Sequence, residues 1–148
     1  MNTATLIPLR VHTRWMIRRD MVDVLAIEES TPAPWDEERI LKHMDQRNGI
    51  GFVAEHGAGV VGYMLYEIHP RWLHLARLAV HPGCRRRRVA TELLVKLAAK
   101  LGLQRQTLTA AVPEGCLDVQ LLLRSCGFRC TGEKNGAYQF RFLLNGEG

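Results

Sequence analysis

Four consecutive arginines at residues 85–88 are the side chains in this sequence best suited to binding an anion. They follow a His-Pro-Gly turn at residues 81–83 and lead into an amphipathic pattern that predicts a helix over 87–101. Free amides at a helix N-terminus bind phosphate, and guanidinium groups add forked donors for its oxygens. Because the turn follows a strand-like apolar run at 72–80, the sequence predicts a polyphosphate site at the carboxyl end of a strand.

The elements that must position this loop follow from hydrophobic periodicity and turn residues. Asp20 has the position of a helix N-cap, with Asp23 three residues later in the capping-box position. The runs at 50–55 and 60–68 flank a Gly-containing turn and predict a hairpin. The full pattern predicts strands at 11–17, 50–55, 60–68, 72–80, 107–112 and 137–144, and helices at 20–30, 36–47, 87–101 and 117–125. This order indicates a three-layer α/β protein with a mixed sheet.

Composition describes an ordinary globular protein with an excess of positive charge. The chain has 148 residues, 47% of them hydrophobic, and a net charge of +5, so we expect one domain over residues 1–148 that attracts anions. No stretch reads as a secretory signal or a membrane span. The four cysteines show neither disulfide nor metal-ligand spacing. We therefore expect a reduced, cytoplasmic protein without a metal site.

The arginine segment resembles motif A of the GCN5-related N-acetyltransferases (GNAT family), which reads (Arg/Gln)-x-x-Gly-x-(Gly/Ala) after a strand that ends in Val-x-Pro. Here the core is residues 85–90 (Arg-Arg-Arg-Arg-Val-Ala), and the strand end is Val80-His81-Pro82. Residues 126–128 (Cys-Gly-Phe) are similar to a common Leu-Gly-Phe of the family, and residues 34–37 (Pro-Trp-Asp-Glu) look like a stretch of the ribosomal-protein-alanine N-acetyltransferases. The resemblance implies a three-layer α/β/α fold with a central mixed, mostly antiparallel sheet.

The resemblance also implies a site for acetyl-CoA as co-substrate. The main chain at 78–80 would pair with the pantetheine arm, amides from 86 to 91 would hold the pyrophosphate, and Cys116 stands where the family has an asparagine near the thiol. The implied cofactor-binding residues are Leu78, Ala79, Val80, Arg85, Arg86, Arg87, Arg88, Val89, Ala90, Thr91 and Cys116. By the same resemblance, Trp35, Glu37 and Glu38 are expected at the acceptor site.

Three positions depart from the family pattern. Arg88 replaces a glycine that permits a positive φ, Leu123 replaces the tyrosine that acts as general acid, and Ala111 replaces a catalytic glutamate. Some family members carry a catalytic glutamate at the position of His74, and a histidine pKa near neutrality suits a general base. His74 is therefore our candidate base, with Tyr138 and Glu67 as weaker candidates.

The missing acid and base bear on the acceptor. Deprotonating an α-amine at pH 7 costs about 1 kcal/mol, whereas a lysine side chain costs about 4.6 kcal/mol. The sequence thus predicts an N-acetyltransferase for a primary amine, with a protein N-terminus as the favoured acceptor, acting as monomer or homodimer. Two alternatives remain: an acyl-CoA-binding module without activity, and a basic nucleic-acid-binding domain, which the strand and helix around the arginines disfavour.

Overall fold

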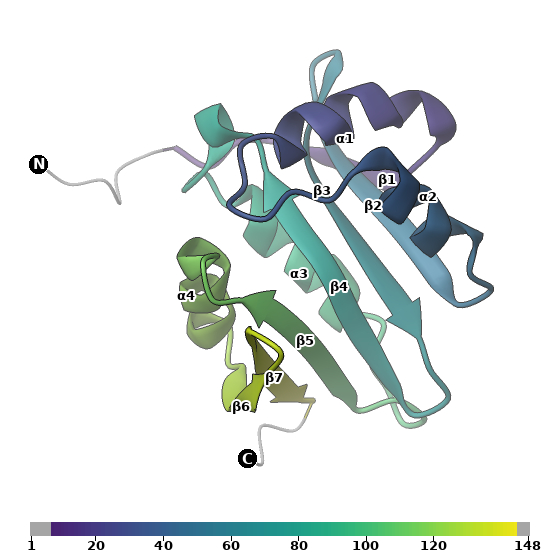
Figure 1. The fold of residues 1–148 in the computed structure, drawn as a ribbon, viewed down its shortest axis with the longest axis vertical. Helices are drawn as coiled ribbons and strands as arrows, with labels where there is room; N and C mark the ends of the chain where they lie inside the picture. Colours follow the sequence, from purple (N-terminus) through teal and green to yellow (C-terminus); the bar gives the residue numbers. More distant parts are fainter. Residues whose placement is uncertain (1–6, 145–148) are drawn as a thin grey trace, which may run out of the picture.

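One continuous seven-stranded sheet with helices on both faces makes up the computed structural model, which describes residues 7–144 (Figure 1). The strands are β1 (His12–Trp15), β2 (Gly49–His56), β3 (Gly59–Ile68), β4 (Trp72–Val80), β5 (Thr107–Pro113), β6 (Arg129–Lys134) and β7 (Ala137–Leu143). The α-helices are α1 (Met21–Glu28), α2 (Glu37–Asp45), α3 (Val89–Ala98) and α4 (Leu117–Ser125). Two short 3-10 helices, Arg18–Asp20 and Pro82–Cys84, precede α1 and α3.

The strand order is β1-β2-β3-β4-β5-β7-β6, and every neighbouring pair is antiparallel except β4 and β5. The predicted hairpin is β2 and β3. The parallel pair needs a crossover connection, and α3 provides it. The prediction of a three-layer α/β/α fold with a mixed, mostly antiparallel sheet is confirmed.

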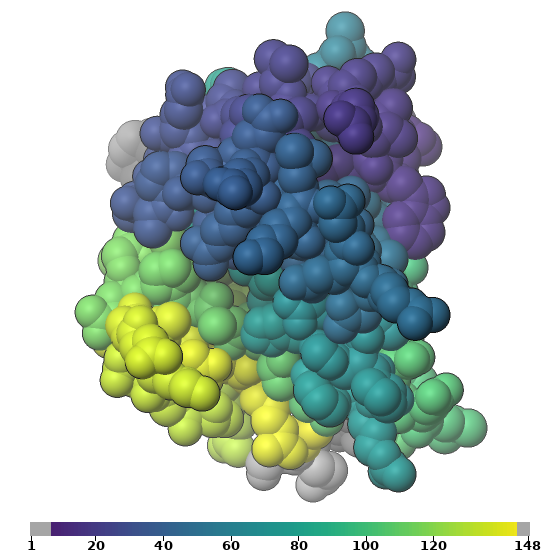
Figure 2. All heavy atoms as spheres, turned by 45° about the vertical axis from the view of Figure 1, so that its right-hand side comes forward, coloured from purple at the N-terminus to yellow at the C-terminus, as the bar shows by residue number. Residues whose placement is uncertain are grey.

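Two apolar cores lie on opposite faces of the sheet, because side chains alternate along each strand. On β4, Leu75, Leu78 and Val80 pack with α3, whereas Ala79 packs with α1 and α2. Figure 2 shows the α1 and α2 region (purple to blue) lying against the later part of the chain (green to yellow) on one face of the molecule. Among the described residues, no helix is long and apolar enough to cross a membrane.

The sequence prediction missed one strand and misplaced several helix ends. Strand β6 was not predicted, because its sequence, Arg-Cys-Thr-Gly-Glu-Lys, is mostly exposed at the sheet edge and lacks an apolar alternation. Helix α3 begins at Val89 rather than at 87, because Arg88 adopts a left-handed conformation. Helix α2 ends at Asp45 rather than at 47, because Gln46 is already extended.

The predicted capping box at Asp20 is also wrong. Asp20 has helical backbone angles, and its carboxylate accepts hydrogen bonds from Arg14 and from the Ile17 amide instead of capping α1. Asp23 likewise bonds outside the helix, because it accepts the Val60 amide at 3.1 Å. These two carboxylates bind groups on β1 and β3 and so connect α1 to the sheet, instead of capping the N-terminus of the helix.

Tyr66 on β3 places a hydroxyl in the core without a partner. Its side chain is fully buried, and its Oη is the one enclosed side-chain polar atom among residues 7–144 that has no hydrogen bond. Burial raises the pKa of Tyr66 to about 12. Since an unsatisfied buried group costs about 1–3 kcal/mol, we expect Tyr66→Phe to raise the free energy of unfolding by about 1 kcal/mol in urea denaturation. Tyr63→Phe, which loses a bonded hydroxyl, should do the opposite.

Candidate active site

The candidate site lies where β4 and β5 separate. Their parallel pairing begins at Trp72 and Thr107 and ends at Leu75 and Ala110, although both strands continue beyond this point. On its other side β4 carries an irregularity, since Leu65 pairs with Arg77 while Tyr66 pairs with Leu75. The second half of β4 therefore has free main-chain groups facing a gap in the sheet. A small cavity lies in this gap, bordered by residues 75–78 of β4, 110–113 of β5, Cys116 and Val119.

A larger cavity of about 420 Å³ adjoins this gap and is big enough for a cofactor-sized ligand. It extends from the α1–α2 loop past the end of β4 to the start of α3 and the face of α4. Its lining residues are Thr31, Pro32, Arg77, Leu78, Ala79, Val80, Cys84, Arg85, Arg86, Arg88, Val89, Ala90, Thr91, Cys116, Asp118, Val119, Leu121, Leu122 and Ser125.

Ten of the eleven residues predicted to bind the cofactor border this cavity. The exception is Arg87, whose Nε donates a hydrogen bond to the carbonyl oxygen of Ile7 at 2.9 Å. Its own carbonyl accepts the Leu9 amide at 3.0 Å. Arg87 thus contacts the N-terminal segment rather than the cavity.

The loop before α3 turns twice through left-handed backbone. Arg86 has a φ of 64° and Arg88 a φ of 68°, a region that favours glycine. The turn at Arg88 brings the start of α3 onto the cavity, where the amides of Val89, Ala90 and Thr91 precede the first helical bond, from Glu92 to Arg88 at 2.9 Å. Such free first-turn amides form an anion site. The structure therefore explains why glycine suits position 88.

Replacing Arg88 with glycine should relieve this backbone strain. A left-handed conformation costs a residue with a Cβ roughly 1 kcal/mol, so we expect Arg88→Gly to raise the free energy of unfolding by a similar amount. The measurement is urea denaturation, with Arg87→Gly as the control, because Arg87 is absent from the positive-φ residues. A loss of stability at position 88 together with unchanged stability at 87 would contradict this assignment.

Positive charge dominates the cavity wall. Among the described residues, one acidic side chain borders it, that of Asp118. Four arginines border it: Arg77, Arg85, Arg86 and Arg88. Arg85 is held in place, since it donates to the Val80 carbonyl at 3.2 Å and to Ser30 Oγ at 3.1 Å. The four arginines of residues 85–88 consequently do not form one free surface patch: two of them are tied to other segments.

Besides Arg88, which borders the larger cavity, three other residues replace family residues that would contact the thiol or act in catalysis. Cys116, at the start of α4, is buried and borders both cavities. Leu123 is fully buried in the core between α4 and the sheet. Ala111 borders only the smaller cavity. Of Cys116, Leu123 and Ala111, only Cys116 carries a titratable group.

His74 and Tyr138 border neither cavity. His74 lies in the paired half of β4, with its Nδ1 2.8 Å from Thr109 Oγ1. Tyr138 lies on β7 opposite Val112 and is partly buried against the core. The catalytic role of either residue stays a prediction.

Burial lowers the pKa of His74 below its ordinary value. The unfolded chain therefore takes up a proton near pH 6.5 that the folded chain binds only at lower pH, so His74 makes stability fall as pH drops below about 6.5. We expect His74→Gln to flatten this part of the stability profile. Denaturation midpoints from pH 7 to pH 5 measure it, and His56→Gln is an exposed control.

The predicted acceptor residues lie at the start of α2. Asp36 caps this helix by accepting the Arg39 amide at 2.9 Å, and Glu37 and Glu38 occupy its exposed first turn. Trp35 is half-buried and lies under the Arg39 guanidinium, 3.8 Å from the ring centre. None of the three predicted residues borders the cavity; Thr31 and Pro32 of the same loop do.

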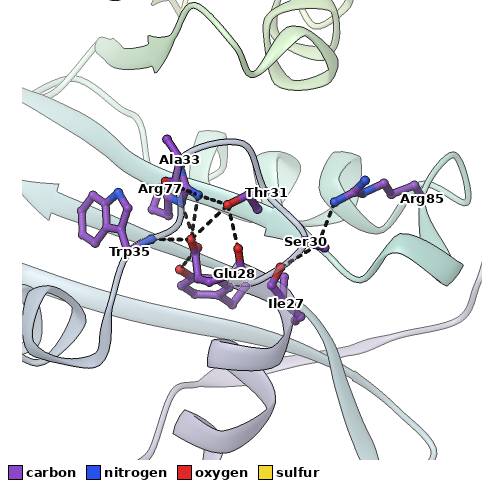
Figure 3. A network of polar contacts seen from close by, with 9 residues as sticks. Ile27, Glu28, Ser30, Thr31, Ala33, Trp35, Arg77 and Arg85 are labelled. Carbon is purple, nitrogen blue, oxygen red and sulfur yellow. Dashed lines mark hydrogen bonds and ion pairs between the residues drawn. The ribbon is translucent and has the colours of Figure 1, made fainter.

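A buried ion pair between Glu28, at the end of α1, and Arg77 on β4 is a further feature of the site that the sequence did not predict (Figure 3). Arg77 donates to the two Glu28 carboxylate oxygens at 2.8 and 2.7 Å. Glu28 also accepts the Tyr63 hydroxyl and, at 2.8 Å, the Trp35 amide. An arginine inside the apolar run at 75–80 was the available signal, because such residues are rarely buried without a partner.

Both members of the pair stay charged. Burial alone would raise the pKa of Glu28, but hydrogen bonds from Arg77, Tyr63 and the Trp35 amide outweigh it and lower that pKa. Burial opposes the charge of Arg77 as well, and the bonds to Glu28 reverse this and raise its pKa. The result is a fixed guanidinium at the margin of both cavities.

Comparisons with known proteins agree with this architecture. A family model described as "Acetyltransferase (GNAT) family" matches residues 17–128. The ribosomal-protein-S18-alanine N-acetyltransferase of Escherichia coli is a similar structure, with 18% identity, a TM-score of 0.77, and 91% of this chain and 94% of that chain covered. No curated protein sequence matches the chain.

Two further similar structures were solved with ligands. PaiA N-acetyltransferase from Thermoplasma acidophilum, in complex with coenzyme A, is 12% identical, with a TM-score of 0.74 over 91% of this chain and 99% of that chain. NAA60 of Arabidopsis thaliana, in complex with a bisubstrate analogue, is 15% identical, with a TM-score of 0.74 over 92% of this chain and 100% of that chain. At these identities the likeness concerns the fold.

Proposed function

Since this chain belongs to the GNAT family of acetyltransferases, we propose that it transfers an acetyl group from acetyl-CoA to a primary amine. The observation that carries the proposal is the cavity of about 420 Å³ that joins the unpaired end of β4 to the first turn of α3. A ligand with a polar arm and a pyrophosphate matches a strand edge followed by free helix amides. PaiA, which shares the fold, was solved with coenzyme A.

In the proposed complex, the main chain of Leu78 to Val80 pairs with the pantetheine arm. The amides of residues 86–91 hold the pyrophosphate, and the guanidinium groups of Arg86 and Arg88 add charge-assisted bonds. Cys116 packs near the sulfur of the thioester. This arrangement places the acyl carbon in the gap between β4 and β5.

The proposed reaction is direct transfer. The neutral amine attacks the acyl carbon, a backbone amide at the end of β4 stabilises the developing oxyanion, and the carbon–sulfur bond then breaks. The electron pair leaves with the CoA sulfur, and the proton lost by the nitrogen neutralises the thiolate. Leu123 cannot donate this proton, so solvent or the amine itself supplies it. Since neither His74 nor Tyr138 borders a cavity as a base for an ammonium group, an acceptor with low amine basicity, such as a protein N-terminus, is favoured.

Two measurements test the proposal. Isothermal titration should detect acetyl-CoA binding in the micromolar range, and no binding near millimolar concentration would overturn it. A thiol assay with a panel of peptides and amines should then detect CoA release. Binding without release would instead favour an acyl-CoA-binding module, for which Leu123 and Arg88 are the motivation. A steeply salt-dependent affinity for RNA or DNA, unaffected by CoA, would favour the nucleic-acid alternative.

A further inference from the structure

The Arg77 guanidinium has three nitrogens that can donate hydrogen bonds, and the ion pair with Glu28 occupies two of them, Nε and Nη2. The residue is 6% exposed and borders both cavities. Its Nε and Nη2 donate to Glu28, and Nη2 also donates to Thr31 Oγ1 at 2.9 Å and to the Ala33 carbonyl at 3.3 Å. Its Nη1 makes no hydrogen bond to any residue in the range 7–144.

This nitrogen is not sealed in the core. Among the described residues, the Tyr66 hydroxyl is the one fully enclosed side-chain nitrogen or oxygen that lacks a partner, so Nη1 retains access to open space. The space that Arg77 borders is the pair of cavities. Figure 3 shows the guanidinium beneath the α1–α2 loop, beside Thr31, Ala33 and Trp35. Nη1 is therefore a positioned donor with two protons for a ligand.

The local charge favours an oxygen ligand over a second cation. The Glu28 carboxylate is already shared among Arg77, the Tyr63 hydroxyl and the Trp35 amide, so it has little capacity left for an incoming ammonium group. Four arginines and one aspartate border the larger cavity. Polyamines and lysine-rich segments are disfavoured by this balance.

We propose that Arg77 Nη1 binds a carboxylate or carbonyl oxygen that the acceptor carries on the carbon next to its amine-bearing carbon. The acceptor class is then an α-amino acyl compound, either a free amino acid or a peptide N-terminus, rather than an alkylamine or a lysine side chain. This inference rests on the proposed acetyl transfer. The bonds to Glu28, Thr31 and Ala33 fix the direction of the guanidinium, so recognition needs no rearrangement of the loop.

The test compares acceptors with and without the oxygen. For the wild type, kcat/KM is measured with alaninamide, alanine and ethylamine, and Arg77→Lys is measured in parallel. Lysine keeps the charge beside Glu28 but has a single nitrogen. We expect the ratio of alaninamide to ethylamine to fall roughly tenfold or more in the variant, because a bond to a charged donor is lost. An unchanged ratio would overturn the proposal. If Arg77→Lys lowers kcat/KM more for alanine than for alaninamide, the preferred oxygen belongs to a carboxylate. If it lowers kcat/KM more for alaninamide, the preferred oxygen belongs to a carbonyl group.

A binding readout separates this inference from the proposed function. N-acetylalaninamide and N-ethylacetamide are titrated into the CoA-saturated protein, and their affinity ratio should show the same loss in Arg77→Lys. If turnover is absent but the ratio changes, acetyl transfer is refuted while the subsite stands. Arg14→Lys is the matched control, since Arg14 pairs with Asp20 and Glu55 and borders neither cavity. Should Arg77→Lys fail to fold, the double variant Glu28→Met/Arg77→Met removes Nη1 without leaving a buried charge.

Discussion

Replacing Glu28 with leucine should lower the free energy of unfolding by about 3–5 kcal/mol, because it leaves the Arg77 guanidinium buried without its carboxylate. The change also removes the acceptor for the Tyr63 hydroxyl and the Trp35 amide. Urea denaturation monitored by tryptophan fluorescence measures the effect. Glu29→Leu is the control, because the adjacent Glu29 is exposed and its replacement should change stability by less than about 0.5 kcal/mol.

A double-mutant cycle with Arg77→Leu shows whether the loss belongs to the pair. The double variant Glu28→Leu/Arg77→Leu should be more stable than either single variant, since two apolar side chains can replace a buried ion pair at little cost. If the losses of unfolding free energy in the two single variants simply add in the double variant, Glu28 and Arg77 are not coupled, and the ion pair drawn in Figure 3 does not stabilise the protein. Acid should mimic the loss: the pKa of Glu28 is lowered in the folded state, so its stabilisation is present above the unfolded pKa and disappears as pH falls through the folded pKa.

Replacing Ala90 with glutamate should weaken acetyl-CoA binding about a hundredfold. Ala90 lies in the first turn of α3 and borders the cavity where the pyrophosphate is proposed to bind. A carboxylate about 5 Å from a phosphate charge costs roughly 3 kcal/mol at an effective dielectric constant near 20. Isothermal titration measures the loss. The folded protein should not be destabilised, because an acidic residue near a helix N-terminus interacts favourably with the helix dipole.

Val95→Glu provides the matched control on the same helix. Val95 is 57% exposed and borders neither cavity. Val95→Glu should leave acetyl-CoA affinity within about twofold, because its charge lies about one and a half turns further along the helix and is screened by solvent. Equal losses from the two variants would indicate a general charge effect, and no loss at position 90 would place the pyrophosphate elsewhere.

The parts of the molecule that could be predicted from sequence are those governed by local patterns. Short β-like runs bounded by turn residues identified β2, β3 and β4, and the period of α3 identified its buried face. The loop at residues 85–88 could be located because a turn, a charge run and a helix start coincide there. The strained backbone at Arg88 could also be anticipated from the sequence, since the motif has a glycine at this position and other residues adopt a positive φ only with strain.

The parts that could not be predicted depend on contacts between distant residues. Glu28 and Arg77 are 49 positions apart, and nothing local to either residue indicates its partner. Asp20 satisfies the local rule for an N-cap, yet Arg14 offers its carboxylate a stronger bond in the folded protein. His74 has suitable chemistry for a base, but only the register of β4 reveals that it faces Thr109. Local sequence patterns therefore predict helices and strands, whereas the partners of individual side chains depend on tertiary packing.

The short seam between β4 and β5 also affects how the protein holds together. Four residue pairs link these strands, while the pairing of β2 with β3 and of β5 with β7 runs nearly the full length of each strand. The sheet thus consists of two well-paired halves joined by a narrow connection, and this junction should be the first to open in partial unfolding. A ligand lodged in the gap touches both halves, so its binding free energy adds to their cohesion. We therefore expect acetyl-CoA bound at the proposed site to stabilise this junction against opening.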